Sequence, residues 1–251
     1  MIVDAIIPAL DEEAALPGVL AELRATVVRN VIVVDNGSTD RTREVALAAG
    51  ALVVDEPHRG YGAACLRGIE AACALEPPPD VLVFLDGDGA DDPSELSRLL
   101  EPLRQGRADF VIGSRVLPGA RVERFALTPQ ARAGNLLAVS MIRVLYGARQ
   151  TDLGPFRAIR LDALLRLEMC DRDFGWTAEM QVKAIRERLR IAEVPASWRR
   201  RRGGKSKISG TVRGVLGAGL KIITTIVKHS IKRRAPGAET EPAQSKLRKR
   251  A

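Results

Sequence analysis

The feature that most constrains the fold is a series of short apolar runs separated by segments with helical periodicity. The runs lie at 1–7, 30–35, 51–54, 80–86 and 108–113, and the intervening segments 11–28, 37–49, 60–75 and 93–103 carry apolar residues at helical spacing or turn and capping residues. Buried strands that alternate with helices are typical of a mainly parallel sheet covered on both faces. We therefore expect an α/β fold with a parallel central sheet flanked by helices.

The second half of the chain has a looser pattern. We expect a loop over 118–129, a helix over 130–145, a loop entering a strand over 152–160, a helix over 177–188 and a strand over 190–195. A long amphipathic helix follows at 211–234. These features predict three regions: a main domain at 1–207, a basic amphipathic helix at 208–234 and a disordered basic tail at 235–251.

Polar residues gather where the expected strands end. Asp11 and Glu12 follow the first strand, Asp35 ends the second, Asp86 and Asp88 end the fourth, and Arg115 follows the fifth. The carboxyl ends of parallel strands form the edge where ligands bind in such sheets. The pair Asp86 and Asp88, with only Gly87 between them, suits a divalent cation, although a solvated acidic turn is the simpler alternative.

Charge and composition narrow the function classes. From residue 199 onward the chain has 16 Lys and Arg against 2 acidic residues, whereas the first 198 residues carry a net charge of −6. A basic C-terminal part points to an anionic partner such as a membrane or a nucleic acid. Two histidines and three unpatterned cysteines argue against a Ser-His-Asp triad, a multi-histidine zinc site and a disulfide framework. Few aromatic residues make nucleic-acid stacking an unfavoured hypothesis.

Targeting and membrane signals are weak. The N-terminus lacks a basic region, and no apolar run is long enough to span a bilayer, since the best candidate at 211–231 contains Arg213, Lys221 and Lys228. We expect a cytoplasmic protein, with the option of peripheral attachment at the inner membrane face. The helix at 211–234 has an apolar stripe opposite its lysines, so it either docks on the domain or lies on an anionic membrane.

Several ordered motifs resemble family 2 glycosyltransferases of the GT-A fold. These motifs are PALDEE, VVDNGSTD, RGYGAA, FLDGDGADDP, IGSR, DLGPFRAIR, FGWTAEMQ and RRGGKSKISGT. The sequence is most similar to the branch of polyprenyl-phosphate mannosyl- and glucosyltransferases, over about residues 2–225. The resemblance implies an inverting, metal-dependent hexosyltransferase that uses a UDP- or GDP-sugar donor, Mg²⁺ or Mn²⁺, and a polyprenyl-phosphate acceptor.

The resemblance also assigns site residues. It implies that Pro8, Ala9, Glu12 and Asp35 contact the nucleoside and that Asp86, Gly87 and Asp88 hold the metal and diphosphate. It implies phosphate or acceptor contacts for Arg115, Arg202, Lys205 and Lys207, and Arg115 also counts among the expected catalytic residues. One departure is Ala90, which stands where several relatives have a metal-proximal glutamine and is followed by Asp91.

The chemistry of the transfer is consistent with these assignments. A diphosphate leaving group needs a cation and basic side chains to take up developing negative charge. A hydroxyl acceptor would require a general base, for which Asp152 and Glu179 are the candidates, whereas a phosphate acceptor is already anionic. Turn capping for Asp152 and a plain helix-surface role for Glu179 remain open. Phe174 and Trp176 are candidates for an acceptor pocket or for simple packing.

Three other functions stay open at this stage. One is a transferase with a soluble hydroxyl acceptor, and another is a catalytically inactive binding module. The third is a nucleic-acid- or membrane-binding module that acts through the basic C-terminus. The acidic main domain and the absence of a recognition motif argue against nucleic acid. A sugar-nucleotide pyrophosphorylase is disfavoured because PALDEE is not a glycine-rich loop.

Overall fold

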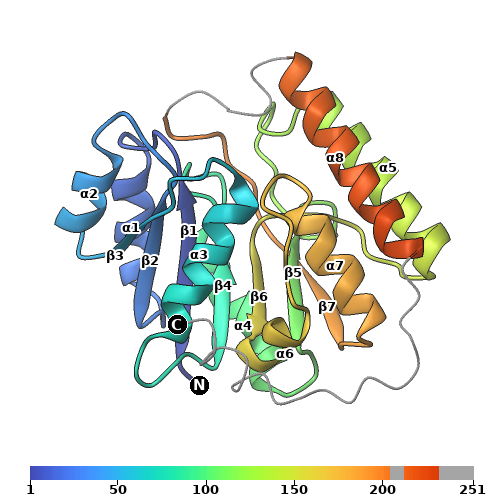
Figure 1. Ribbon diagram of the computed structural model, residues 1–251, viewed down its shortest axis with the longest axis horizontal. Coiled ribbons are helices and arrows are strands. Elements are labelled where there is room, and N and C mark those ends of the chain that lie inside the picture. Colours follow the sequence, from blue (N-terminus) through green and yellow to red (C-terminus); the bar gives the residue numbers. More distant parts are fainter. Residues whose placement is uncertain (204–211, 232–251) are drawn as a thin grey trace.

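The computed structural model describes residues 1–203 and 212–231. Within these residues seven strands form one sheet in the order β3-β2-β1-β4-β6-β5-β7, with helices on both faces (Figure 1). The strands are β1 (Val3–Ala9), β2 (Asn30–Asp35), β3 (Leu52–Asp55), β4 (Val81–Phe84), β5 (Phe110–Ser114), β6 (Arg157–Arg160) and β7 (Ile191–Pro195). The layered α/β architecture expected from the alternating pattern is confirmed.

The sheet is parallel except at β6. Strand β1 lies between β2 and β4 with parallel pairing on both sides, β2 pairs parallel with β3, and β5 pairs parallel with β7. Strand β6 lies antiparallel between β4 and β5. This antiparallel direction follows from the point at which the chain re-enters the sheet. The Thr151 hydroxyl lies 2.7 Å from that of Ser114 at the end of β5. Strand β6 therefore starts at the carboxyl edge and runs back.

Each face of the sheet has its own core. The helices α1 (Leu16–Arg24) and α4 (Leu96–Arg104) pack on one face, together with inward residues such as Ile7 and Val83. The helices α3 (Tyr61–Cys73), α6 (Leu161–Arg166) and α7 (Trp176–Arg186) pack on the other, with Ile6 and Phe84. Neighbouring strand residues such as Ile6 and Ile7 belong to opposite cores because side chains alternate along a strand. Covering both faces is what makes these strands apolar throughout.

Two helical expectations need correction. Helix α1 begins at Leu16, not near Asp11, because Asp11 has a left-handed backbone conformation with φ of 50° and Pro17 favours the first turn of a helix. Helix α6 was not expected at all, since a six-residue helix leaves little periodicity to detect. The remaining helical elements are α2 (Thr42–Ala48), the 3₁₀ turn η1 (Pro93–Glu95), α5 (Pro129–Tyr146) and α8 (Val212–Ile231).

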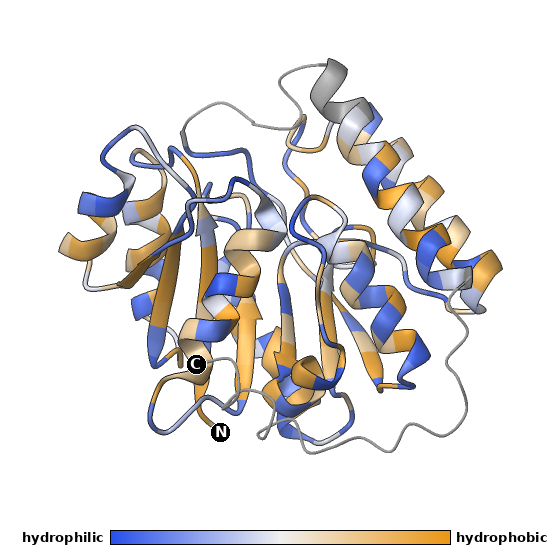
Figure 2. Ribbon diagram, viewed as in Figure 1, coloured by the Kyte–Doolittle hydropathy of each residue, from blue (hydrophilic) through white to orange (hydrophobic). Residues whose placement is uncertain are grey.

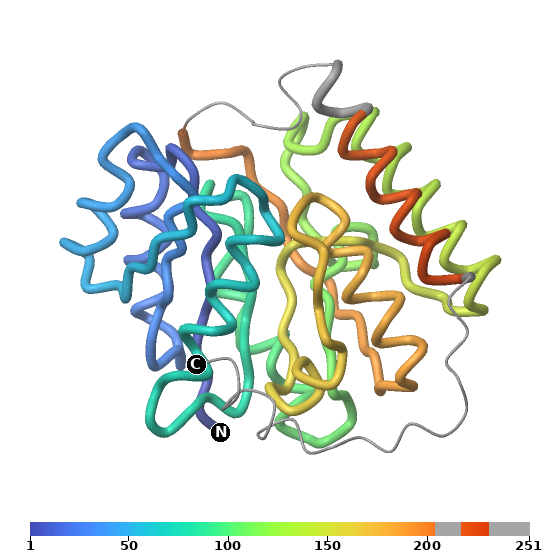
Figure 3. Tube along the Cα trace, viewed as in Figure 1, coloured from blue at the N-terminus to red at the C-terminus, as the bar shows by residue number. Residues whose placement is uncertain are grey.

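Helix α8 docks on the domain. It lies beside α5 and near α7 at one end of the sheet, as the ribbon and the Cα trace show (Figures 1 and 3). Ile226 is fully buried with Ile142 and Val182, the Tyr146 hydroxyl donates to the Ile226 carbonyl at 2.5 Å, and Arg186 donates to the His229 carbonyl at 2.9 Å. Docking through the apolar stripe, one of the two options for this helix, is therefore what the structure shows.

The described residues test only part of the membrane and domain predictions. In the described ranges 1–203 and 212–231 no helix has both the length and the apolarity to cross a membrane. The predicted boundaries 207/208 and 234/235 and the tail 235–251 lie outside the described residues. They stay predictions.

Candidate active site

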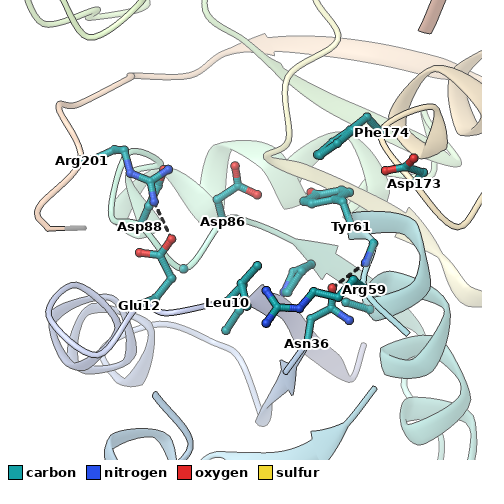
Figure 4. A pocket seen from close by; sticks show the side chains of 15 residues that line it. Leu10, Glu12, Asn36, Arg59, Tyr61, Asp86, Asp88, Asp173, Phe174 and Arg201 are labelled. Carbon is teal, nitrogen blue, oxygen red and sulfur yellow. Dashed lines mark hydrogen bonds and ion pairs between the residues drawn. The ribbon is translucent and has the colours of Figure 1, made fainter. Parts of the chain in front are cut away.

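A pocket of about 370 Å³ opens at the carboxyl ends of β1, β2 and β4. One wall comes from the segment after β1 and another from the end of β4. The far wall comes from the start of α3 and the loop before α7 (Figure 4). In this view Arg201 and Glu12 lie on one side of Asp86, and Tyr61 with Phe174 lies on the other. The pocket is at the edge where the strand-end acids predicted a site.

The end of β1 and the segment after it line the pocket, but Asp35 does not. Pro8, Ala9 and Glu12 are lining residues. The Asp35 carboxylate accepts from the Ser38 amide at 2.9 Å and so closes the turn after β2. Its neighbour Asn36 lines the pocket instead, with its amide group donating to the carbonyls of residues 56 and 58 and accepting from the amide of residue 60.

Asp86, Gly87 and Asp88 all line the pocket directly after β4. Asp88 is only 5% exposed, and its carboxylate accepts from the Ala90 amide at 2.8 Å. A Cβ at Gly87 would lie 3.2 Å from Ile7, so this position leaves little room for a side chain. Two carboxylates one residue apart offer hard oxygen ligands, the chemistry that Mg²⁺ and Mn²⁺ prefer. The donor set therefore fits a divalent cation.

Two acids at this site, Asp86 and Asp91, have raised pKa values. Burial raises the pKa of Asp86 to about 7, with a further rise from the charge of Asp88, while the Tyr61 hydroxyl, Arg201 and Arg115 oppose the rise. Burial also raises the pKa of Asp91, whose carboxylate accepts from the Asp86 amide at 3.0 Å. A cation that enters the pocket would favour the ionised form of these carboxyls and lower their pKa values.

Arg201 is the cation that the structure places beside these acids. Its guanidinium lies 2.9 Å from the Asp88 carboxylate and also pairs with Glu12. The segment carrying it is held against the end of β4, since the Arg202 amide donates to the Asp88 carbonyl at 3.0 Å. The Arg202 side chain turns away to Glu22. The predicted phosphate contacts Lys205 and Lys207 lie outside the described residues.

Arg115 and Asp152 form one unit. The Asp152 carboxylate is 1% exposed and accepts from Arg115 Nε at 2.8 Å, from its Nη2 at 2.6 Å and from its amide at 2.8 Å. The guanidinium also stacks on Trp198, 4.8 Å from the ring centroid. A carboxylate with both oxygens engaged by one guanidinium is suited to orienting that arginine rather than to taking a proton. Neither residue lines the pocket.

Glu179 lies outside the pocket as well. It is fully buried, and its carboxylate accepts from the amides of Cys170 and Asp171 and pairs with Lys183 at 2.8 Å. Hydrogen bonds from Cys170 and Lys183 oppose burial and leave the pKa of Glu179 lowered. A buried carboxylate that is held ionised in this way fixes a loop, so neither candidate base is placed where a general base would act.

Sequence reasoning missed several lining residues. They are Leu10, Asn36, Arg59, Gly60, Tyr61, Ala64, Asp173 and Arg201, together with Phe174, which the sequence suggested only for an acceptor pocket or for packing. Tyr61 stands edge-on to Trp176, with ring centroids 6.1 Å apart, and Trp176 is fully buried. The tight fit of α3 could have been read from Gly60 and Gly62, where a Cβ would lie 2.1 Å from backbone oxygens of Arg172 and Asp171. Arg201 sits in a run of four arginines that gives no residue a distinct signal.

The sequence is similar to those of known glycosyltransferases. A family model described as glycosyl transferase family 2 matches residues 4–167. An uncharacterized glycosyltransferase of Mycobacterium tuberculosis is 37% identical over 212 residues, which cover 84% of this chain and 92% of that protein. The undecaprenyl-phosphate mannosyltransferase of Micrococcus luteus is 36% identical over 222 residues, which cover 83% and 88%.

Solved structures share the fold. Glucosyl-3-phosphoglycerate synthase from Mycobacterium tuberculosis, crystallised with Mn²⁺, UDP-glucose and phosphoglyceric acid, superimposes with a TM-score of 0.72. The aligned region is 24% identical and covers 93% of this chain and 81% of that one. At this identity the likeness concerns the fold alone, and it agrees with the GT-A fold that the sequence motifs implied.

Proposed function

The chain belongs to glycosyl transferase family 2, and on that premise we propose that it transfers a hexose from a nucleotide sugar to a polyprenyl phosphate with inversion at the anomeric carbon. The observation that carries the proposal is the pocket at the carboxyl ends of β1, β2 and β4, where Asp86 and Asp88 face Arg201. Likeness to the undecaprenyl-phosphate mannosyltransferase of Micrococcus luteus supports the choice of acceptor.

The charges of the pocket suit a donor diphosphate. Asp86 and Asp88 would hold Mg²⁺ or Mn²⁺, and the bound ion would offset negative charge on the leaving diphosphate. Arg201 supplies a second cation at the same place, only partly exposed and already paired with Asp88. Charge-assisted hydrogen bonds from a guanidinium to phosphate oxygens are among the stronger polar contacts in proteins. Tyr61, Leu10 and Phe174 give the pocket apolar walls for a nucleoside.

The placement of Asp152 and Glu179 favours a phosphate acceptor. Asp152 is engaged by Arg115 and Glu179 by the loop before α7, so the two carboxylates predicted as bases have other partners. A hydroxyl acceptor would need its proton removed during attack, whereas a phosphate oxygen attacks as an anion. The acceptor needs only to be held in line with the anomeric carbon. We assign that task to cationic groups that line the pocket, Arg201 and Arg59.

A membrane-bound acceptor also suits the outer surface of the helix pair α5 and α8. Figure 2 shows apolar residues on these two helices alongside charged ones. Leu136, Leu137 and Val144 of α5 are 67%, 50% and 82% exposed, and Leu220 of α8 is 63% exposed. Exposed apolar side chains among basic ones favour binding at an anionic lipid surface. We propose that this pair is the membrane-facing surface of a peripheral protein.

Calorimetric titration of the purified protein with UDP-glucose and with GDP-mannose, each with and without Mn²⁺, tests the proposal. Metal-dependent binding of one donor is the expected result and identifies the base. Transfer of the radiolabelled hexose to undecaprenyl phosphate in detergent then tests the acceptor, with a soluble glycerol acceptor as the comparison. Failure of both nucleotide sugars to bind, with or without metal, would overturn the assignment of this pocket to either donor.

A further inference from the structure

The loop at 167–175, between α6 and α7, forms the far wall of the donor pocket. Asp173 and Phe174 of this loop are lining residues. Its backbone fits closely against the start of α3, because the Arg172 carbonyl accepts from the Ala63 amide at 2.9 Å. Gly60 leaves no room for a side chain on that side. Any shift of the loop would therefore move both the wall and the beginning of α3.

Glu179 holds this loop from within the protein. Its carboxylate accepts from the Asp171 amide at 2.7 Å, from the Cys170 amide at 3.1 Å and from the Cys170 thiol at 2.9 Å. Lys183, one turn further along α7, balances the charge. Burying an ionised carboxylate costs free energy unless it has such partners. The hydrogen bonds of Glu179 therefore fix the geometry of residues 170–171.

Helix α8 holds the same loop from outside. Lys221 pairs with the Asp171 carboxylate at 3.3 Å, and the Thr225 hydroxyl donates to it at 3.4 Å. His229 Nε2 lies 3.6 Å from the Glu179 carboxylate. These groups surround a second cavity of about 410 Å³ between the loop and α8. The helix therefore contacts the loop through individual polar side chains around this cavity. Each of these contacts can be removed by one substitution.

We propose that Asp171 and Glu179 are positioning residues for the donor, with α8 as the outer anchor that keeps Asp173 and Phe174 against the nucleotide sugar. The proposal rests on the proposed function of the first pocket. It assigns Glu179 a role that acts through the loop and not through contact with substrate. It also couples the C-terminal helix, which carries part of the proposed membrane surface, to donor affinity.

The test uses the full-length chain with three variants and one matched control. Lys221→Met keeps the aliphatic stem but removes the cation, Asp171→Asn keeps an acceptor for the Asp173 amide but removes the charge, and the third variant combines both. Asp162→Asn is the control, because Asp162 is an exposed aspartate of α6 that pairs with Arg166 and lines neither cavity. Donor affinity is measured by calorimetry, and hydrogen exchange is followed at 60–64 and 170–175 without ligand.

Each single variant is expected to weaken donor binding by about three- to tenfold, with the double variant no weaker than the worse single one, because paired residues act as a unit. Exchange at 60–64 and 170–175 should rise in all three and stay unchanged in Asp162→Asn. Unchanged exchange and affinity in folded variants would overturn the inference. Faster exchange in a protein whose wild type binds no donor would leave the anchoring of the loop standing and reject the proposed function instead.

Glu179→Gln provides a second route if the Asp171 variants fail to fold. The amide keeps the volume of the side chain and one oxygen for the backbone amides of residues 170 and 171, but it removes the oxygen that faces the Cys170 thiol and the charge that pairs with Lys183. We expect a higher KM for the donor with kcat changed by less than about twofold, the pattern of lost binding geometry. A large fall in kcat at unchanged KM would contradict a positioning role.

Discussion

Asp86 illustrates how a binding residue can cost a protein stability. Its ordinary pKa is 3.8 and burial raises it to about 7 in the folded protein, so the folded state keeps a proton that the unfolded chain has lost. The free energy of unfolding therefore falls as the pH rises between these values and stays low above them. A residue whose ionised form is disfavoured in this way is a candidate for function rather than for folding.

Replacing Asp86 with Asn is expected to stabilise the metal-free protein above neutral pH. The gain should be about 1–3 kcal/mol at pH 8 and should vanish below about pH 3, where the wild-type carboxyl is protonated in both states. Thermal unfolding followed by circular dichroism in EDTA measures it. The same variant should lose any stabilisation that Mn²⁺ gives the wild type. A variant that is less stable than the wild type at pH 8 would show that the buried charge is not strained.

Arg201 and Arg200 allow a sharp comparison between neighbours. Arg201 pairs with Asp88 and Glu12 in the proposed donor pocket, whereas Arg200 is exposed and stacks beside Phe125. Arg201→Gln should weaken binding of the nucleotide sugar by about tenfold because a charge-assisted contact to phosphate is lost. Arg200→Gln should leave the affinity within about twofold. Equal effects in calorimetry would mean that only the overall charge of the arginine run matters.

For single residues, the sequence predicted some positions in the pocket and failed to predict others. Asp86, Gly87 and Asp88 stood out because acids follow a buried strand directly, and the structure places all three in the pocket. Asp35 had the same signal but caps a turn, since the Ser38 amide is within reach. The local sequence does not distinguish Arg201 from Arg202. The path of the extended segment beside β4 decides which of the two guanidinium groups enters the pocket. The metal and phosphate roles themselves stay predictions.

At the level of elements, most helices and strands followed from periodicity, and the exceptions have tertiary causes. Strand β6 runs antiparallel because the chain returns to the sheet at the carboxyl edge, which no local pattern encodes. Helix α8 showed its length and amphipathic character in the sequence. Its docking on α5 and α7 depended on partners such as Ile142 and Val182 that lie far away in the chain.

The helix pair α5 and α8 gives a prediction at this scale. Val144→Glu combined with Leu220→Glu should lower binding to vesicles of anionic phosphatidylglycerol by about tenfold, since each change places a carboxylate where apolar surface meets lipid. Both residues are exposed, so the fold should tolerate the change. Leu47→Glu combined with Val27→Glu places the same charges on exposed apolar positions elsewhere. Sedimentation with vesicles compares the two, and equal losses would point to net charge instead of a membrane-facing surface.

At the scale of the whole molecule, the proposed donor pocket joins distant parts of the chain. Its lining runs from Pro8 to Arg201 and includes the end of β1, the start of α3, and the loops after β2, after β4 and before α7. The family match ends at residue 167, yet the loop before α7 and the segment at Arg201 complete the walls. The alternating strand pattern was sufficient to predict the layered fold. The closure of the pocket was not predictable, since it depends on the packing of segments almost two hundred residues apart.

This arrangement predicts that donor and metal together stabilise the protein as one cooperative unit. At a donor concentration of about 100 times Kd, binding adds about 2.7 kcal/mol, which raises Tm by about 5–10 °C for a chain of this size. Differential scanning calorimetry should show a single transition that moves upward with donor and Mn²⁺ but much less with either alone. Asp88→Asn should abolish the shift while leaving Tm without ligand almost unchanged. A shift that donor alone produces in full would remove the metal from the binding step, and a split transition would show that the segments around the pocket fold independently.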